Sequence, residues 1–405
     1  MLIRSYWPGP EGGAECQCRK LVAQLDRLGV TCTIVTYWPA WNVPRRERKG
    51  NVLICRVGVL RPAIRRVLDW RNRIRGPTAG IQAVAEGAGS ARRFRPLGPL
   101  RWLSRLSFMI EAAAVVRRGH FDVIHVHESH WLAGFGAWLA DRLGIPVVCK
   151  ESTWPALPPS EVDVPFGRIW ERWRTRPWFI ATGPHIRDSL AEQGVPADRI
   201  CVVPTGVEIP AGTSALEGNR VLYVGNLWQG ARWKAFDVLM EAWGRVHAAE
   251  PGARLAVVGG GDPRPWQDKA RELGCGESVM FAGTVDDVSV FYRQAGLFVL
   301  PSRREGLSNA LLEAQSWGIP AVVSDIPGNR AVVRDGENGI LVPVNDSGAL
   351  AAAILRLLRD AGLQARMGRA ARLRMERDFA MEEVARQIAA VYQQVIGTSR
   401  AGRCA

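Results

Sequence analysis

Two glutamates, Glu305 and Glu313, are separated by residues 306–312, a short run that is small and polar at first and then apolar. An apolar run, 296–301, precedes them, and a second one, 318–325, follows. A strand, a turn and a helix in this order place unpaired backbone N–H groups and the positive end of a helix dipole where they can hold a phosphate. Carboxylates do not hold phosphate, so we expect the two glutamates to bind sugar hydroxyls.

The spacing of the two glutamates limits what they can do together. In one continuous helix, eight residues turn about 800°, which leaves the carboxylates about 80° apart around the axis and ~12 Å apart along it. Such a pair would not form a close acid/base dyad. If Glu305 instead lies in the turn and Glu313 lies two turns further on, each can reach a different part of one extended ligand. The competing interpretation makes Glu305 a helix cap and Glu313 a solvated residue; the position between two buried strands favours the functional one.

Alternating elements must position these groups. Strand-like runs occupy 2–6, 31–36, 52–56, 121–127, 146–149, 179–182 and 200–203 in the first half, and 221–224, 255–258, 279–281, 297–300, 321–323 and 339–342 in the second. Helical stretches between strands predict parallel sheets with helices on both faces. Because 405 residues are too many for one ordinary core, we predict an α/β fold of two tandem Rossmann-like doubly wound domains that face a central cleft.

The composition suggests where these domains meet. Residues 1–203 form the predicted first domain, which we expect to bind the acceptor. Residues 204–219 are rich in Pro, Gly, Ser and Thr and form the predicted linker. Residues 220–378 form the second domain, and 379–397 a C-terminal helix that packs back on the first. A ligand is expected in the cleft, at the carboxyl ends of both sheets.

The segment that contains the two glutamates resembles the Glu-x7-Glu signature of the retaining glycosyltransferases of family 4, which have the GT-B fold. The resemblance covers most of the chain and is strongest from about 180 to 345. It implies a retaining, metal-independent glycosyltransferase in which Glu305 is catalytic at the transferred sugar and Glu313 binds the ribose of the nucleotide. It also implies that the donor lies against the backbone of Gly306, Leu307, Ser308 and Asn309.

A second motif, residues 225–239, resembles the family's pattern of a glycine, an arginine, a variable loop and Lys-Gly-x-Asp-x-Leu. Lys234, Asp237 and Leu239 match the last part. The resemblance implies that Lys234 pairs with the diphosphate leaving group, whose oxygens gain charge and need a fixed cation.

This motif departs from the family pattern at two positions. Asn226 stands where the arginine is usual, and Ala235 stands where the glycine is usual. Arg232 is therefore our candidate for the missing positive charge at the donor phosphates.

Two further segments match parts of the family that contact the donor. Gly12 and Gly13 follow the first strand and precede a helix, where glycine lets backbone approach a phosphate closely. A glycine pair is often only a turn, but the resemblance places this one over the donor phosphates. Residues 283–285 resemble the part that meets the nucleobase, so Val285 is included in the predicted donor site.

A histidine at the carboxyl end of a parallel strand faces the ligand cleft. Residues 121–127 form such a strand, and the family commonly places a histidine near the transferred sugar. We choose His127 as catalytic because it is the last residue of the strand. His125 could be a core histidine, and His130 could reach the site from the following loop.

The net charge of +14 limits the partners. Arginine is concentrated in residues 61–118, with aromatic residues between the charges. This region fits an anionic membrane surface or a lipid-linked, pyrophosphate-bearing acceptor. A solvated helical face ranks close behind, and nucleic acid last. No apolar run is long enough to span a membrane and no secretory signal is visible, so we expect a cytoplasmic protein, peripheral on the inner face of the membrane.

The sequence suggests no metal site and no cofactor. Its eight cysteines are scattered without ligand spacing, and Asp286 and Asp287 fit a helix cap better than a cation site. The nucleotide-sugar would be a substrate.

We therefore predict transfer of a sugar from a nucleotide-sugar, with uridine diphosphate as the expected carrier, to a glycan or lipid-linked glycan in cell-surface polysaccharide biosynthesis. Two alternatives stay open: a nucleotide-sugar isomerase or epimerase on the same scaffold, and a basic nucleic-acid-binding protein.

Overall fold

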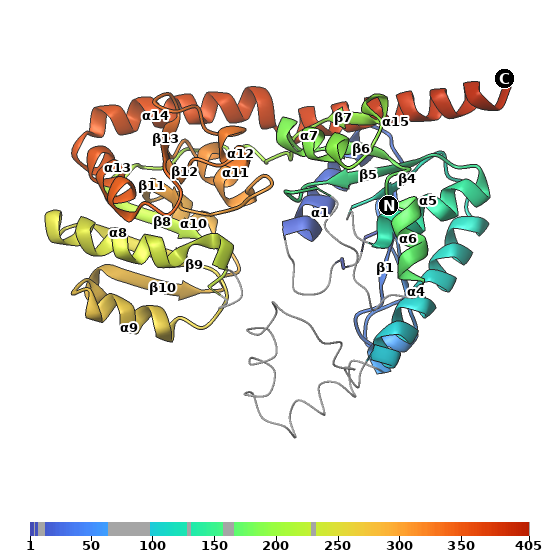
Figure 1. Ribbon diagram of the computed structural model, residues 1–405, viewed down its shortest axis with the longest axis horizontal. Coiled ribbons are helices and arrows are strands. Elements are labelled where there is room, and N and C mark those ends of the chain that lie inside the picture. Colours follow the sequence, from blue (N-terminus) through green and yellow to red (C-terminus); the bar gives the residue numbers. More distant parts are fainter. Residues whose placement is uncertain are drawn as a thin grey trace. The chain divides into compact units, whose positions relative to one another are not determined.

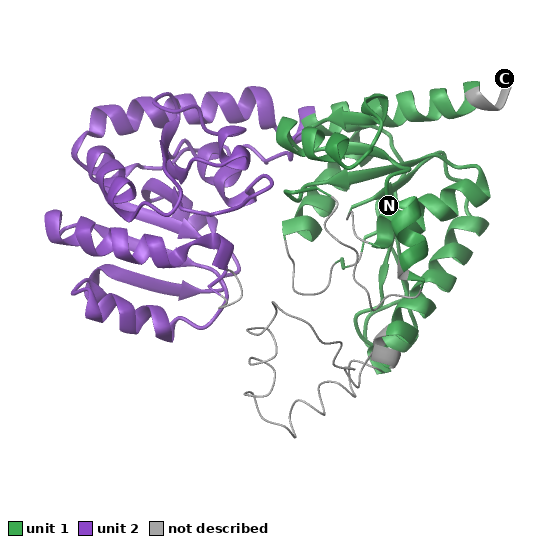
Figure 2. Ribbon diagram, viewed as in Figure 1, with its two compact units in different colours: residues 1–203, 384–405 green, residues 204–383 purple. Residues whose placement is uncertain are grey.

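In a computed structural model, the chain divides into two compact units (Figures 1 and 2). The structure describes residues 1–3, 5–6, 13–63, 98–127, 131–156, 166–227 and 232–404. Unit 1 comprises residues 1–203 and 384–405, and unit 2 comprises residues 204–383. The residues predicted as a linker pack within unit 2. Val207 forms a bridge with Ala380, and Ser214 donates a hydrogen bond to the carbonyl oxygen of Ala295 over 2.7 Å.

Unit 1 is built on parallel strands. One group has the order β1 (Thr33–Tyr37), β3 (Val52–Val57) and β2 (Arg46–Lys49), in which β2 is antiparallel to β3. The other has the parallel order β4 (Ile124–Val126), β5 (Val147–Glu151), β6 (Trp178–Ala181) and β7 (Ile200–Val202). Leu2 joins the two groups because it bridges both Val35 and Val126. Among the described residues of the predicted first strand, 2–6, Leu2 alone forms a bridge.

Helices cover this sheet. They are α1 (Gly13–Arg27), α4 (Gly98–Arg118), α5 (Trp131–Leu143), α6 (Gly167–Trp173), α7 (Pro184–Glu192) and most of α15 (Met381–Cys404). Phe108, Trp131, Phe135 and Trp170 from α4, α5 and α6 pack with Val126 and Cys149 of the sheet. Side chains alternate along a strand, so His125 and Val148 face the other way. On that face His125 contacts Tyr392 of α15.

Unit 2 contains one six-stranded parallel sheet. Its strands are β8 (Glu217–Val224), β9 (Arg254–Val258), β10 (Val279–Gly283), β11 (Ala295–Leu300), β12 (Ala321–Ser324) and β13 (Gly339–Val342), in the order β10-β9-β8-β11-β12-β13. The chain adds strands on one side of β8 and then on the other, so the direction of winding changes between β8 and β11. Ligands of open parallel sheets bind at such a switch point, beyond the carboxyl ends of the strands.

The helices of unit 2 differ in how they begin. They are α8 (Phe236–Ala249), α9 (Arg264–Glu272), α10 (Ser289–Tyr292), α11 (Asn309–Ser316), α12 (Pro327–Arg330), α13 (Ser347–Arg359) and α14 (Ala361–Arg374), followed by a π-helical turn, Met375–Phe379. Three of them, α11, α13 and α14, have side-chain caps. Asp346 and Asp360 cap α13 and α14, because their side chains accept hydrogen bonds from N–H groups of the first turn.

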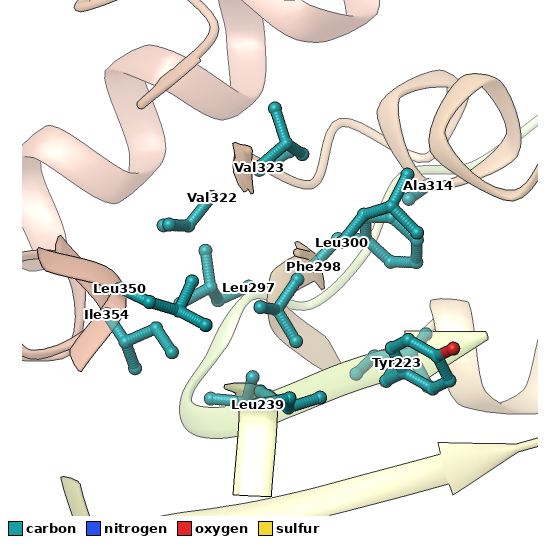
Figure 3. Close-up of a cluster of buried hydrophobic side chains, with 14 of the residues drawn as sticks. Tyr223, Leu239, Leu297, Phe298, Leu300, Ala314, Val322, Val323, Leu350 and Ile354 are labelled. Carbon is teal, nitrogen blue, oxygen red and sulfur yellow. The ribbon is translucent and has the colours of Figure 1, made fainter. Parts of the chain in front are cut away.

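The core of unit 2 explains why its strands are continuous apolar runs. All residues of β11 and β12 are buried, as expected for strands with helices on both faces. Figure 3 shows Leu297, Phe298 and Leu300 of β11 among side chains of β8, β12, α8, α11 and α13. The predicted α/β class with parallel sheets is confirmed in both units. Among the described residues, none of the helices combines the length and apolar character of a membrane-spanning segment.

Candidate active site

An ion pair lies at the switch point of unit 2. The ammonium of Lys234 donates to Oε1 of Glu305 over 2.7 Å. Lys234 ends the 3-10 turn Arg232–Lys234 that precedes α8, and Glu305 lies in the turn between β11 and α11. The hydroxyl of Ser302 also donates to Oε1 of Glu305, over 2.7 Å. Both charged side chains are mostly buried, with 20% of Lys234 and 11% of Glu305 exposed. Two residues predicted to act on the donor are thus in direct contact.

Arg303 fixes the two segments that carry this ion pair. Its guanidinium donates to both carboxylate oxygens of Asp237, over 3.0 and 2.6 Å, and to the carbonyl oxygen of Arg232 over 2.6 Å. Its backbone N–H donates to the carbonyl oxygen of Trp233 over 2.7 Å. The matched aspartate of the second motif therefore has a structural function: it holds the turn of Lys234 against the turn of Glu305.

A tyrosine that the sequence analysis did not single out lies beside this pair. The hydroxyl of Tyr223, in β8, is buried and has no hydrogen-bond partner among the described residues. Burial, and then the carboxylate of Glu305, raises the pKa of Tyr223 well above its usual value, so the hydroxyl stays protonated. A Cβ at Gly225 would lie 2.7 Å from the hydroxyl oxygen. Glycine at this position therefore leaves room for the backbone to pass the tyrosine closely.

The second glutamate is held separately, in the second turn of α11. The hydroxyl of Tyr292 donates to Oε2 of Glu313 over 3.2 Å. Ser308 caps the helix by accepting from the N–H of Leu311. Since α11 begins at Asn309, Glu305 lies in the preceding turn. This is the arrangement in which the two glutamates could contact different parts of one ligand.

Gly328, in the short helix α12, packs against the backbone of the site. A Cβ at this position would lie 2.5 Å from the carbonyl oxygen of Glu305 and closer still to that of Gly306. We expect Gly328→Ala to push this turn out of place. Unfolding free energy should fall by about 1–3 kcal/mol, and kcat/KM for glycosyl transfer by roughly 10- to 100-fold. Chemical denaturation and initial rates measure the two effects.

The matched control is Gly252→Ala, because a Cβ at Gly252 would meet nothing within 4 Å. It should leave both quantities unchanged. If Gly328→Ala behaves like Gly252→Ala, the close packing of this turn has no functional role.

In unit 1, the predicted histidine lies at the end of β4 in a buried pair. The rings of His125 and His127 stack, with centroids 4.3 Å apart and planes 4° apart. Nδ1 of His125 is hydrogen-bonded to the hydroxyl of Tyr392. Nε2 of His127 is buried without a partner among the described residues. Burial first, and then neighbouring positive charge, lowers the pKa of both histidines well below the usual value, so both imidazoles are neutral at pH 7.

Lys150, beside His127, was missed by the sequence analysis. It lies in β5, and its side chain is buried. Its ammonium forms no hydrogen bond or ion pair with another described residue. Burial lowers its pKa from 10.5 to about 8. The sequence held a signal, because a Lys-Glu pair directly follows the apolar run 146–149.

The other residues predicted for the site lie in both units of the chain or outside the described residues. Gly13 begins α1 in unit 1, and Gly12 and His130 lie outside the described residues. In unit 2 the side chain of Arg232 is exposed, and Val285 is half-buried against the core. Of the three residues predicted to be catalytic, Lys234 and Glu305 are in contact in unit 2. Four of the predicted donor-binding residues, Gly306 to Asn309, follow Glu305 directly in the chain.

The sequence is similar to glycosyltransferase families and to individual glycosyltransferases. Residues 11–209 match the family described as Glycosyltransferase Family 4, and residues 218–360 match Glycosyl transferases group 1. A D-inositol 3-phosphate glycosyltransferase of Acidothermus cellulolyticus is 31% identical over 387 residues, which cover 85% of this chain and 82% of the relative. A phosphatidyl-myo-inositol mannosyltransferase of Mycobacterium leprae is 30% identical over 348 residues, which cover 82% and 90%. The resemblance inferred from the two glutamates is therefore confirmed.

Solved structures share the fold. The sucrose-phosphate synthase of Thermosynechococcus elongatus superimposes with a TM-score of 0.72 at 22% identity and covers 98% of this chain and 96% of its own. HepE of Anabaena, solved with UDP and glucose, has a TM-score of 0.69 at 17% identity, with 97% and 98% covered. These similarities confirm the predicted GT-B fold class.

Proposed function

This chain belongs to glycosyltransferase family 4 and is a glycosyltransferase, and on that premise we propose that it is a retaining enzyme whose donor is a uridine-diphosphate sugar. The observation that carries the proposal is the Lys234–Glu305 ion pair at the switch point of unit 2. A carboxylate that can accept from sugar hydroxyls and an ammonium that can pair with phosphate oxygens lie side by side there. The solved HepE complexes with UDP and with UDP-glucose support the choice of nucleotide.

The proposed chemistry is a substitution at the anomeric carbon. The bond from this carbon to the diphosphate oxygen breaks, and the acceptor hydroxyl forms a new bond on the same face. The hydroxyl proton passes to the departing phosphate oxygen. Lys234 offsets the charge that develops on the diphosphate, together with the N–H groups at the start of α11. In this proposal no metal or cofactor is required.

The two glutamates have separate functions in the proposal. Glu305 accepts from hydroxyls of the transferred sugar, and Ser302 and Lys234 keep its carboxylate oriented. Glu313, oriented by Tyr292, accepts from the ribose. His127 is the proposed catalytic residue of unit 1, and its imidazole is neutral.

For the acceptor we propose an alcohol that carries a phosphate. The names of the two relatives include inositol 3-phosphate and phosphatidyl-myo-inositol, and both compounds contain a hydroxyl-rich ring and a phosphate. A lipid-linked glycan of cell-surface polysaccharide synthesis, our expectation from the sequence, belongs to the same chemical class. A location at the inner membrane face remains a prediction, because most of residues 61–118 lies outside the described part.

Nucleotide-sugar binding tests this proposal. We expect one UDP-sugar to raise the unfolding midpoint of the wild type, since a ligand at about 100 times its Kd stabilises by about 2.7 kcal/mol. Glu313→Ala should lose most of this shift, because the ribose contact is removed. Glu241→Ala, an exposed glutamate of α8, is the matched control and should respond like the wild type. The proposal fails if no nucleotide-sugar shifts the wild type.

A further inference from the structure

Three polar side chains of unit 1 share one face of the sheet near its carboxyl edge. Val126 of β4 pairs with Cys149 of β5, so the next residues, His127 and Lys150, lie beside one another. Lys150 pairs in turn with Ile180 of β6, and Thr182 follows two residues later. Paired residues of parallel strands, and residues two apart, point to the same face. His127, Lys150 and Thr182 therefore converge from the ends of three neighbouring strands.

All three side chains are buried, and each has unused hydrogen-bonding capacity. Exposure is 6% for His127, 7% for Lys150 and 1% for Thr182. Neither Nε2 of His127 nor Oγ1 of Thr182 has a partner within the described ranges. Buried polar groups are nearly always paired in folded proteins, so three unpaired donors in one place suggest a bound group that accepts from them.

Among the residues that the structure describes, no neighbour neutralises Lys150. Cys18 of α1 is near, but burial raises the pKa of its thiol to about 12, so it stays uncharged. Glu151 points to the opposite face by strand alternation, and its carboxylate accepts from the N–H of Thr153 over 2.7 Å. His125 and His127 are neutral. A buried ammonium without a counter-charge is costly unless something anionic completes the site.

We propose that His127, Lys150 and Thr182 form a phosphate-binding site in unit 1. Lys150 supplies the charge, Thr182 donates from its hydroxyl, and His127 donates from Nε2 in the tautomer that carries its proton there. A tetrahedral phosphate has enough oxygens to accept from all three groups. Phosphate is the chemical group that both substrates of the proposed function would share: a phosphate on the acceptor, or the diphosphate of the donor. The assignment therefore rests on the proposed function for the identity of the ligand.

The test measures binding by calorimetry to the full-length protein, with inorganic phosphate, myo-inositol 1-phosphate and UDP as probes. Lys150→Met keeps an unbranched apolar side chain and removes its charge. We expect it to weaken phosphate binding by about tenfold or more, the usual size of a lost charge-assisted contact. Thr182→Val keeps the shape and removes the hydroxyl, so a smaller, several-fold loss is expected. The matched control is Lys49→Met, which removes one exposed charge from β2 of the same unit.

Folding is checked in the same experiment. Lys150→Met removes an unpaired buried charge, so without anions its unfolding midpoint should equal or exceed that of the wild type. Loss of myo-inositol 1-phosphate binding with UDP binding retained would assign the site to the acceptor. Loss of UDP binding would assign it to the donor diphosphate.

Two results would overturn the site: a wild type that binds none of the three probes, or a Lys150→Met variant that binds them as tightly as the wild type. Failure of the proposed function would look different. In that case, nucleotide-sugars would leave the wild type unshifted while phosphate still bound in a Lys150-dependent way.

Discussion

Replacing Lys234 with methionine should lower kcat/KM for glycosyl transfer by about 10²- to 10³-fold, the usual effect of removing one preorganised charge that stabilises a transition state. Lys234 is half of the ion pair with Glu305, and 20% of its side chain is exposed. In the proposed reaction its ammonium meets the diphosphate oxygens as they gain charge. Most of the loss should therefore appear in kcat, measured from initial rates at saturating donor.

A matched pair on the surface of unit 2 provides the control. Nζ of Lys269 lies 3.3 Å from Oε2 of Glu272, so these residues form the same kind of ion pair. Both belong to α9, outside the turns that contain Lys234 and Glu305. Lys269→Met should leave kcat/KM unchanged. The double variant Lys234→Met/Glu305→Gln should lose far less than the product of the two single losses, because the residues act as one unit. A Lys234→Met enzyme with wild-type kcat would contradict the proposed role.

Lys150 should change the unfolding free energy of the ligand-free protein by about 3 kcal/mol as the pH is varied. The reason is that burial lowers the pKa of Lys150 from 10.5 to about 8 on folding. Between these pH values the unfolded chain binds the proton and the folded protein does not. The contribution of Lys150 to the unfolding free energy therefore becomes more favourable as the pH rises from about 8 to 10.5. Below pH 8 both states are protonated and the folded state bears the full cost.

Other groups titrate nearby, so the comparison must be with Lys150→Met. Burial raises the pKa of the Cys18 thiol, which lowers stability as pH rises and opposes Lys150. The buried amino group of Met1 and the neutral rings of His125 and His127 share the same surroundings. The difference between variant and wild type removes these shared contributions. We expect the stability advantage of Lys150→Met to shrink by about 3 kcal/mol from pH 7 to pH 10.5; a difference that stays constant would show that Lys150 is not desolvated.

The fold class was predictable from the sequence because local patterns carry that information. Continuous apolar runs such as β11 and β12 identify buried parallel strands. The turn between β11 and α11 was also predictable, because Ser308 is a capping residue ahead of an apolar helical run.

Which side chains are partners could not be predicted from the sequence. Lys234 and Glu305 are 71 residues apart, and Arg303 and Asp237 are 66 apart. Nothing in the local composition of either segment shows that they meet. Tyr223 was missed for the same reason, since an apolar strand with a tyrosine is ordinarily a core strand, and only its contact with Gly225 and the field of Glu305 distinguish it.

The amino-acid sequence by itself therefore determined the two α/β units, the place of the glutamates at the end of a buried strand, and the family. These features depend on periodicity and on short motifs, which act over a few residues. Only the tertiary structure decided that Lys234 pairs with Glu305, that Arg303 holds their two turns together, and that His127, Lys150 and Thr182 converge on one face. Strand order and register set those distances, and they arise from packing between segments remote in the chain.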